Sequence, residues 1–305
     1  MKHLLTILAL VAFVSNVLAQ KTITLSLERS GADEIITNYW NNSTAPHSNE
    51  ETEDERINER LHIYHTSQTD FYIYKADPAK ANGLGVVITP GGGYRKVCIA
   101  HDGFAMAQYL RSLGVSSIVV KYRLPNGHSI IPLEDTQEAM RYMRKRGPEW
   151  GVDPTKVGIC GSSAGGHLAA YASTFTPDEE KPVFSILVYP VITGAEQSSI
   201  INTFKELVGE QDFETKQREL WLEKHVTPTT PPALLLLSDD DPLVPSTSSV
   251  RYYEALKAND VAATMFILPS GGHSWCGHDE FKYSNLCKAA IADWLQIQEE
   301  RLNKK

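Results

Sequence analysis

Lys156-Val157-Gly158-Ile159-Cys160 is an apolar run that leads directly into Gly161-Ser162-Ser163-Ala164-Gly165 and then into the helix-forming segment 166–174. The five middle residues match the pattern G-x-S-x-G, and a strand before this pattern with a helix after it is the setting of a nucleophile elbow. We expect the two glycines to permit a sharp turn that exposes the Ser163 hydroxyl at the end of the strand. The helix that begins there would also favour negative charge beside Ser163.

Outward from this turn, strand-like and helix-like segments alternate along the chain. Short apolar runs, typical of strands buried on both faces, cover residues 85–89, 116–122, 156–160, 184–189, 233–237 and 263–268. Segments with helical character cover residues 104–113, 133–146, 164–174, 248–258 and 283–301. This alternation predicts an α/β fold with a mostly parallel central sheet and helices on both faces.

Two parts of the chain depart from that alternation. Residues 22–27 and 71–74 resemble strands, and the polar residues 31–60 between them predict a surface loop with a solvated acidic stretch at 50–59. Later, residues 193–230 contain polar and helical segments without a strand. We predict one domain over residues 20–305, with 193–230 as a small cap insertion beside the carboxyl edge of the sheet.

A serine hydroxyl needs an adjacent base to act as a nucleophile, and the base needs a carboxylate to orient it. Gly271-Gly272-His273-Ser274 follows the last predicted strand, so His273 is the candidate base, with His278 as the nearby competitor. The acidic run that follows strand 233–237 offers Asp241, at the head of Asp-Pro-Leu-Val-Pro, with Asp240 as the alternative. The chain order Ser, Asp, His is that of the nucleophile-elbow enzymes.

A serine nucleophile also needs backbone donors for the oxyanion that forms during attack. Pro90-Gly91-Gly92-Gly93-Tyr94 follows strand 85–89, where such donors are expected. We predict an oxyanion hole made by the backbone N–H of Ala164 with that of Gly92 or Gly93. The same glycines are a poor phosphate loop, since neither Lys-Ser/Thr nor the pattern G-x-G-x-x-G accompanies them.

The net charge of −8 disfavours nucleic acid and anionic membrane surfaces as partners, because both repel an acidic protein. Residues 1–19 have a positive start and an apolar stretch, which predict a signal peptide cleaved before Gln20 and a secreted or periplasmic protein. A retained membrane anchor is the alternative reading of residues 1–19. Cys160 is expected to be buried and free, and Cys276 and Cys287 are close enough in sequence to pair.

Taken together, these motifs resemble the secreted carbohydrate-esterase branch of the α/β hydrolases, the acetyl xylan esterase and feruloyl esterase-like proteins. The shared stretches are Pro90-Gly91-Gly92-Gly93-Tyr94, Lys121-Tyr122-Arg123-Leu124-Pro125, Gly161-Ser162-Ser163-Ala164-Gly165-Gly166-His167, Tyr189-Pro190-Val191-Ile192, Asp240-Asp241-Pro242-Leu243-Val244-Pro245 and Gly271-Gly272-His273. The resemblance implies an α/β-hydrolase fold and hydrolysis of short acyl esters, such as O-acetyl groups on xylan, without a metal or cofactor. It places Ser163, Asp241 and His273 at the family's catalytic positions. Ser274 departs from the pattern, because relatives usually have glycine directly after the histidine.

The predicted loops also suggest where an acylated carbohydrate would bind. Tyr94 and Trp275 fall on loops on opposite sides of Ser163, which predicts an open, shallow cleft with an aromatic rim. In the alternative, Trp275 packs inward and only anchors the histidine loop. A shallow site of this kind would favour short acyl groups.

The sequence is also to be weighed against other functions. A feruloyl esterase or another carboxylesterase would use the same triad, as would a serine peptidase of the prolyl-oligopeptidase type. Such peptidases generally carry a large N-terminal β-propeller, for which residues 20–84 are too few. A lipase would need a long apolar lid, and residues 193–230 are mostly polar. A binding protein would tolerate a lost triad residue, and a metal-dependent deacetylase would need ligand spacing that His62, His65, His101 and His128 do not show.

Overall fold

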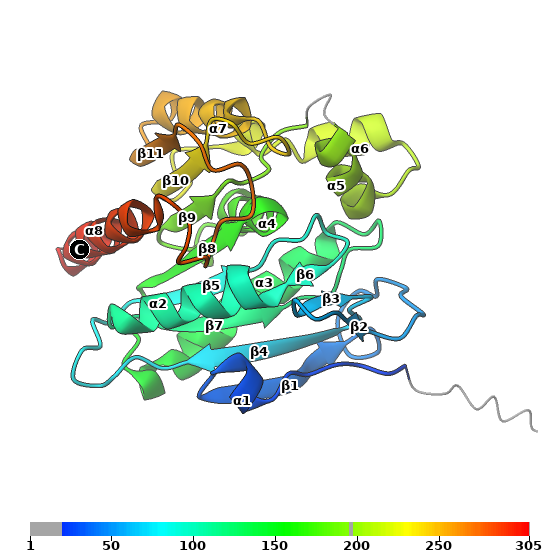
Figure 1. The fold of residues 1–305 in the computed structure, drawn as a ribbon, viewed down its shortest axis with the longest axis horizontal. Coiled ribbons are helices and arrows are strands. Elements are labelled where there is room, and N and C mark those ends of the chain that lie inside the picture. The colour runs from blue at the N-terminus through cyan, green and yellow to red at the C-terminus, as the bar shows by residue number, and fades with distance from the viewer. Residues whose placement is uncertain (1–19, 195–197, 305) are drawn as a thin grey trace, which may run out of the picture.

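An eight-stranded sheet forms the centre of the computed structural model, which describes residues 20–194 and 198–304 (Figure 1). One edge is antiparallel, where β1 pairs with β4 and β4 with β7, and the remaining pairs from β7 to β11 are parallel. In spatial order the strands are β1 (Glu34–Asn41), β4 (Gln68–Tyr74), β7 (Ser116–Lys121), β5 (Gly85–Thr89), β8 (Val157–Ser162), β9 (Ser185–Val188), β10 (Ala233–Ser238) and β11 (Ala263–Leu268).

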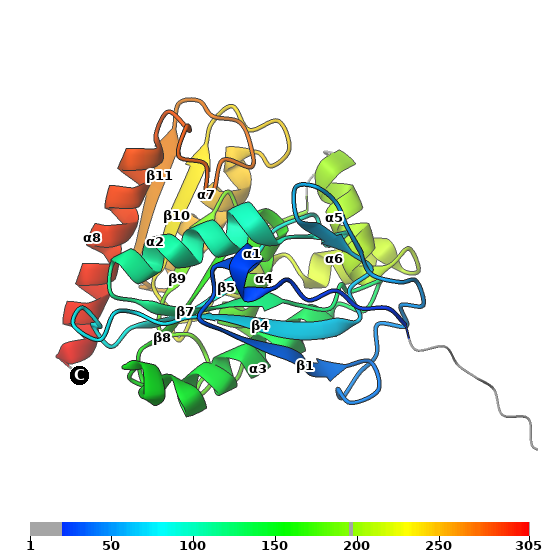
Figure 2. The ribbon, with the colours of Figure 1, turned by 60° about the horizontal axis from the view of Figure 1, so that its bottom comes forward.

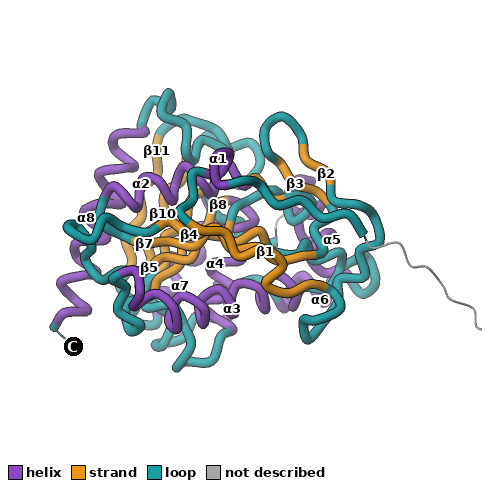
Figure 3. The backbone as a smooth tube through the Cα atoms, turned by 90° about the horizontal axis from the view of Figure 1, so that it is seen from below, coloured by secondary structure: helices purple, strands orange, loops and turns teal. Residues whose placement is uncertain are grey.

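Helices cover both faces of this sheet, as the alternation of segments predicted. Two of them, α2 (Met106–Ser112) and α8 (Ser284–Asn303), lie on one face (Figures 2 and 3). The opposite face carries α3 (Ile130–Arg146), α4 (Ser163–Phe175) and α7 (Ser246–Ala258). Every residue of β4, β5, β7, β8, β9 and β10 is buried, because apolar side chains on both sides of these strands pack under helices.

The remaining elements are a small second sheet and short helical turns. A second, three-stranded sheet contains β2 (Arg56–Ile57), β3 (His62–Tyr64) and β6 (Val97–Cys98). A π-helical segment, Ile99–Ala105, precedes α2, so this helical region begins earlier than residue 104, and a 3-10 turn, Gly147–Trp150, follows α3. Within the described ranges, no helix is both long enough and apolar enough to cross a bilayer.

The first part of the chain differs from its prediction. Residues 22–27 are not a strand: α1 (Leu27–Ser30) begins there, and β1 lies inside the stretch expected to be a surface loop. The reason is that backbone N–H groups of this segment donate to side chains and not to a neighbouring strand. The Leu25 N–H donates to the Tyr72 hydroxyl at 2.9 Å, and the Ile23 N–H donates to the Glu55 carboxylate.

The acidic stretch 50–59 is correspondingly not solvated throughout. Glu55 is buried, and its carboxylate lies 2.9 Å from the Lys121 ammonium, which also lies 3.0 Å from Asp70. All three side chains are fully buried. A buried charge is tolerated only when it is paired and hydrogen-bonded, so this cluster fixes the N-terminal segment against the end of β7.

Residues 193–230 contain two helices and a 3-10 turn: α5 (Ser198–Val208), α6 (Phe213–Glu219) and Leu222–His225. Figure 1 shows α5 and α6 side by side at one end of the molecule. No strand is formed by residues 193–194 and 198–230, which lie between β9 and β10 in the chain and were predicted to be a cap insertion. The predicted signal peptide, residues 1–19, lies outside the described residues.

Candidate active site

The turn between β8 and α4 is sharp. Ser163, the first residue of α4, adopts a left-handed backbone with φ of 54°. A Cβ atom on Gly161 would lie 2.1 Å from the Gly165 carbonyl oxygen, and one on Gly165 would lie 2.0 Å from the Thr89 carbonyl oxygen. Such approaches exclude any other residue, so the two glycines are required by the turn that presents Ser163.

Three side chains that are distant in sequence meet at this turn. The Nε2 atom of His273 lies 2.8 Å from the Ser163 hydroxyl, and its Nδ1 atom lies 2.6 Å from the Asp241 carboxylate. The second oxygen of Asp241 accepts the N–H groups of Leu243 and Val244 at 2.8 and 2.9 Å. The Asp241 side chain is fully buried, and each of its oxygens has fixed hydrogen-bond partners.

The neighbouring carboxylates and the competing histidine make other contacts. Asp240 accepts the Gly272 N–H at 2.8 Å, and this hydrogen bond lowers the pKa of the exposed carboxyl. Asp239 accepts the Ser246 hydroxyl at 3.2 Å. His278 stacks on His101 with ring centroids 4.0 Å apart. The structure thus brings Asp241 and His273, and not their alternatives, to Ser163.

The glycine loop after β5 faces the same point. Gly92 and Gly93 line one cleft together with Ser163 and His273. Over the described ranges, neither the Gly92 nor the Gly93 N–H donates to a protein acceptor. Unpaired N–H groups beside a nucleophile can stabilise an oxyanion. A hydrogen bond fixes the start of the loop, since the Tyr122 hydroxyl donates to the Pro90 carbonyl at 2.8 Å.

Tyr94 does not bind substrate, contrary to its prediction. Its side chain is 1 % exposed, and its hydroxyl lies 2.9 Å from Nδ1 of His167. The opposite ring nitrogen of His167 lies 3.2 Å from the Leu220 carbonyl, to which it donates. Burial lowers the pKa of His167 to about 4, so the ring is neutral and Nδ1 accepts from Tyr94. Tyr94 therefore joins the glycine loop to α4 and to the cap segment.

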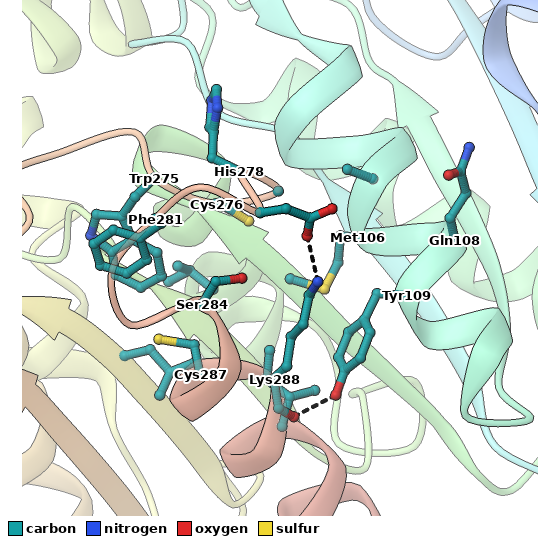
Figure 4. Close-up of a pocket in the computed structure, with 16 residues that line it drawn as sticks. Met106, Gln108, Tyr109, Trp275, Cys276, His278, Phe281, Ser284, Cys287 and Lys288 are labelled. Atoms are coloured by element: carbon teal, nitrogen blue, oxygen red, sulfur yellow. Dashed lines mark hydrogen bonds and ion pairs between the residues drawn. The ribbon is translucent and has the colours of Figure 1, made fainter.

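Trp275 also fails as a rim residue, and the alternative in which it packs inward is correct. Its ring stacks on Phe281 (Figure 4), with centroids 4.6 Å apart. Its N–H donates to the Ser238 hydroxyl at 2.9 Å. It lines a separate cavity of about 290 Å³ behind the histidine loop. Cys276 and Cys287 line the same cavity as free thiols and do not form the disulfide that their spacing allowed, and Cys160 is free and buried as expected.

Two residues at the site had no role in the sequence analysis. Asp102 accepts the Gly91 N–H at 2.9 Å, and burial raises the pKa of its carboxyl. The Tyr189 hydroxyl donates to the other Asp102 oxygen at 3.4 Å and accepts the Cys276 N–H at 3.0 Å, while the Tyr189 ring packs against His273 at 4.5 Å. One buried pair thus connects the glycine loop with the histidine loop. The sequence signals for Tyr189 were its place at the end of a strand and in the shared stretch Tyr189-Pro190-Val191-Ile192, while Asp102 had none.

The cleft has a volume of about 750 Å³. Its lining includes the apolar residues Val191, Ile200, Leu243 and Val244 and the polar residues Ser199, Asn202 and Thr203 of α5. None of its described lining residues is Phe, Tyr or Trp. In the part of the chain that the structure describes, no three His, Cys, Asp or Glu side chains gather into a metal site.

The strand order, the elbow and the three converging side chains agree with a comparison against known families. Residues 86–277 match a family described as having the alpha/beta hydrolase fold. The chain belongs to this alpha/beta hydrolase family. This confirms the predicted fold class and the resemblance drawn from the motifs.

Relatives of this alpha/beta hydrolase include proteins with names tied to xylan. An acetylxylan esterase of Xylanibacter ruminicola is 34% identical over 226 residues, which are 72% of this chain and 46% of that protein. Endo-1,4-beta-xylanase B of Butyrivibrio fibrisolvens is 28% identical over 212 residues, 64% of this chain and 33% of that protein. The chain thus spans less than half the length of either relative.

Among solved structures, an acetyl ester-xyloside bifunctional hydrolase from Caldicellulosiruptor lactoaceticus has a TM-score of 0.68 at 29% identity. The match covers 75% of this chain and 88% of that one, so the likeness extends over nearly all of that protein.

Proposed function

We propose that the protein is a serine esterase that removes short acyl groups, above all O-acetyl groups, from xylan or related plant polysaccharides and oligosaccharides. The observation that carries this proposal is the hydrogen-bonded series from Ser163 through His273 to Asp241, next to the unpaired N–H groups of Gly92 and Gly93. A nucleophile, a base and oxyanion donors at one point are the requirements of acyl transfer.

The geometry supports a two-step reaction. His273 takes the Ser163 proton at Nε2 as the hydroxyl oxygen attacks the ester carbonyl, and the N–H groups of Ala164 and of Gly92 or Gly93 bind the resulting oxyanion. The intermediate collapses as the sugar hydroxyl leaves with the proton from His273. Water then attacks the acyl-enzyme, again giving a proton to His273, and the carboxylic acid leaves as Ser163 recovers its proton. Asp241 stabilises the imidazolium in both steps.

The cleft supports a polar substrate with a short acyl group. Four apolar side chains line the same open cleft as the hydroxyl and amide side chains of α5. A long acyl chain would leave most of its surface in water and gain little from burial. The names of the relatives that act on acetylated xylan or xylosides support the same substrate class.

The sequence of residues 1–19 supports export, and we infer that the enzyme is secreted or periplasmic and acts on polymer outside the cytoplasm. Amino-terminal sequencing of the protein recovered from the exporting host tests this part. A mature chain that begins at Gln20 is expected, and retention of Met1 in a membrane fraction would contradict it.

The deciding experiment measures acetate released from acetylated xylo-oligosaccharides, with feruloylated oligosaccharides, a peptide amide and a triglyceride assayed in parallel. We expect the acetylated oligosaccharides to have the highest kcat/KM, with no loss on addition of a chelator. Faster release of ferulate would identify the feruloyl esterase alternative. Cleavage of the amide in preference to every ester would identify the peptidase.

A further inference from the structure

The cleft has a strongly basic wall in a protein of net charge −8. Arg60, Arg95 and Lys96 all line the cleft that contains Ser163. Throughout residues 20–194 and 198–304, no carboxylate lies within ion-pair distance of any of the three. By contrast, the buried cations Lys121 and Arg123 each contact acids.

The second, three-stranded sheet positions two residues of this basic wall (Arg60, Arg95 and Lys96). Arg60 lies in the turn between β2 and β3, and Lys96 directly precedes β6, which pairs with β3. The Lys96 ammonium donates to Nδ1 of His62 at 3.1 Å. Burial, followed by the charge of Lys96, lowers the pKa of His62 to about 4, so His62 is a neutral acceptor at neutral pH. Figure 3 places β2 and β3 at the same end of the molecule as α5, whose residues form another side of the cleft.

Among the described residues, the two acids that line the cleft, Glu206 and Asp102, form no ion pair with the wall. Burial raises the pKa of Glu206, on α5, although the charge of Arg95 opposes this effect. Burial also raises the pKa of Asp102, which is committed to Gly91 and Tyr189. Arg60 and Arg95 are exposed at the cleft, and Lys96 is half-buried. Cations that line a cleft raise the local concentration of anionic ligands and bind carboxylates through charge-assisted hydrogen bonds.

We propose that the basic wall binds the carboxylate of a uronic-acid residue carried by the acylated polysaccharide close to the ester. This inference rests on the proposed function, since it names the sugar that accompanies the acyl group. An acetyl group fills only a small part of a cleft of about 750 Å³, and the rest extends from Ser163 to the basic wall. The preferred substrate is therefore an acidic, acetylated xylan fragment and not a neutral one.

The first test compares kcat/KM for two acetylated xylo-oligosaccharides of equal length, one with a uronic-acid branch and one without. We expect the wild type to favour the acidic substrate about tenfold, as one charge-assisted contact can supply, and 0.5 M NaCl to reduce this ratio. The combined variant Arg60→Gln, Arg95→Gln, Lys96→Met is expected to bring the ratio close to one. The control is Arg251→Gln, an exposed arginine of α7 that lies outside the cleft lining and should keep the wild-type ratio.

A binding test separates this inference from the esterase proposal. In the Ser163→Ala background, calorimetry with the deacetylated, uronic-acid-branched oligosaccharide should give a Kd about tenfold lower than with the neutral oligosaccharide, a difference that the triple substitution removes. Selective binding without acetate release by the wild type would keep the basic wall and overturn the esterase. Equal affinity for the acidic and neutral oligosaccharides would overturn the basic wall, whatever the activity.

Discussion

Replacing Asp241 with asparagine tests the site at its most specific contact. The oxygen that accepts the Leu243 and Val244 N–H groups would remain a carbonyl, so the amide nitrogen would have to face Nδ1 of His273. Two donors cannot share that 2.6 Å contact, and the ring would adopt the tautomer with its proton on Nε2, toward Ser163. The base would then be lost. We expect kcat to fall by about 10⁴-fold, or about 5 kcal/mol in barrier height.

The assay is kcat for 4-nitrophenyl acetate at pH 8, with Asp240→Asn as the matched control. Asp240 is exposed and gives one acceptor to the Gly272 N–H, a role that an asparagine carbonyl can fill. Its variant should stay within about threefold of wild type, as expected for an exposed hydrogen bond. Thermal unfolding should show both variants folded. A greater loss in Asp240→Asn than in Asp241→Asn would refute the assignment of the orienting carboxylate.

Three further predictions follow from the same contacts. Ser163→Ala should lower kcat at least about a thousandfold without unfolding the protein, and activity above about a tenth of wild type would place the nucleophile elsewhere. Among 4-nitrophenyl esters, acetate should be cleaved best and kcat/KM should fall steeply by octanoate; a preference for octanoate or palmitate would favour a lipase. Because burial raises the pKa of Asp102, its carboxyl stabilises the fold fully only at low pH, and this contribution is lost as the pH rises through the folded-state pKa. The Tm of Asp102→Asn relative to wild type should therefore increase between pH 4 and pH 8, and a constant difference would show that Asp102 stays ionised.

The parallel half of the sheet could be predicted because its signals are local. Apolar runs such as 85–89 and 157–162 are buried on both faces, so their burial follows directly from composition. The elbow at Ser163 could be predicted for a similar reason, since its glycines, strand and helix are contiguous. The order of Asp241 and His273 after their strands then placed both at the same edge.

The N-terminal segment could not be predicted, because its partners are distant in sequence. Ile23 is bonded to Glu55, and Glu55 in turn to Lys121. A glutamate in an acidic stretch has no local feature that marks it as buried. Its burial depends on Lys121, the cation at the end of β7, and only the folded chain brings the two together.

The prediction of an aromatic rim was wrong for a different physical reason. The loops that carry Tyr94 and Trp275 were placed correctly near Ser163, but the direction of a side chain depends on backbone angles and on a buried polar partner. Tyr94 adopts φ of 57° and bonds to His167, and Trp275 finds Ser238. Buried tyrosine and tryptophan normally have such partners, and neither partner is close in sequence.

Some of the strained backbone positions lie around the site. Ser163, Tyr94, Tyr189 and Ser274 all have left-handed φ values, of 54°, 57°, 36° and 65°. A non-glycine residue in such a conformation costs of order 1–3 kcal/mol and persists only where its surroundings determine it. Three of these residues make a buried or part-buried hydrogen bond to another loop or helix: Ser163 to His273, Tyr94 to His167, and Tyr189 to Cys276. These three strained residues thus also join the loops, so the positions of nucleophile, base and oxyanion donors are fixed before substrate binds. Donors that need no rearrangement during the reaction stabilise a developing charge most strongly.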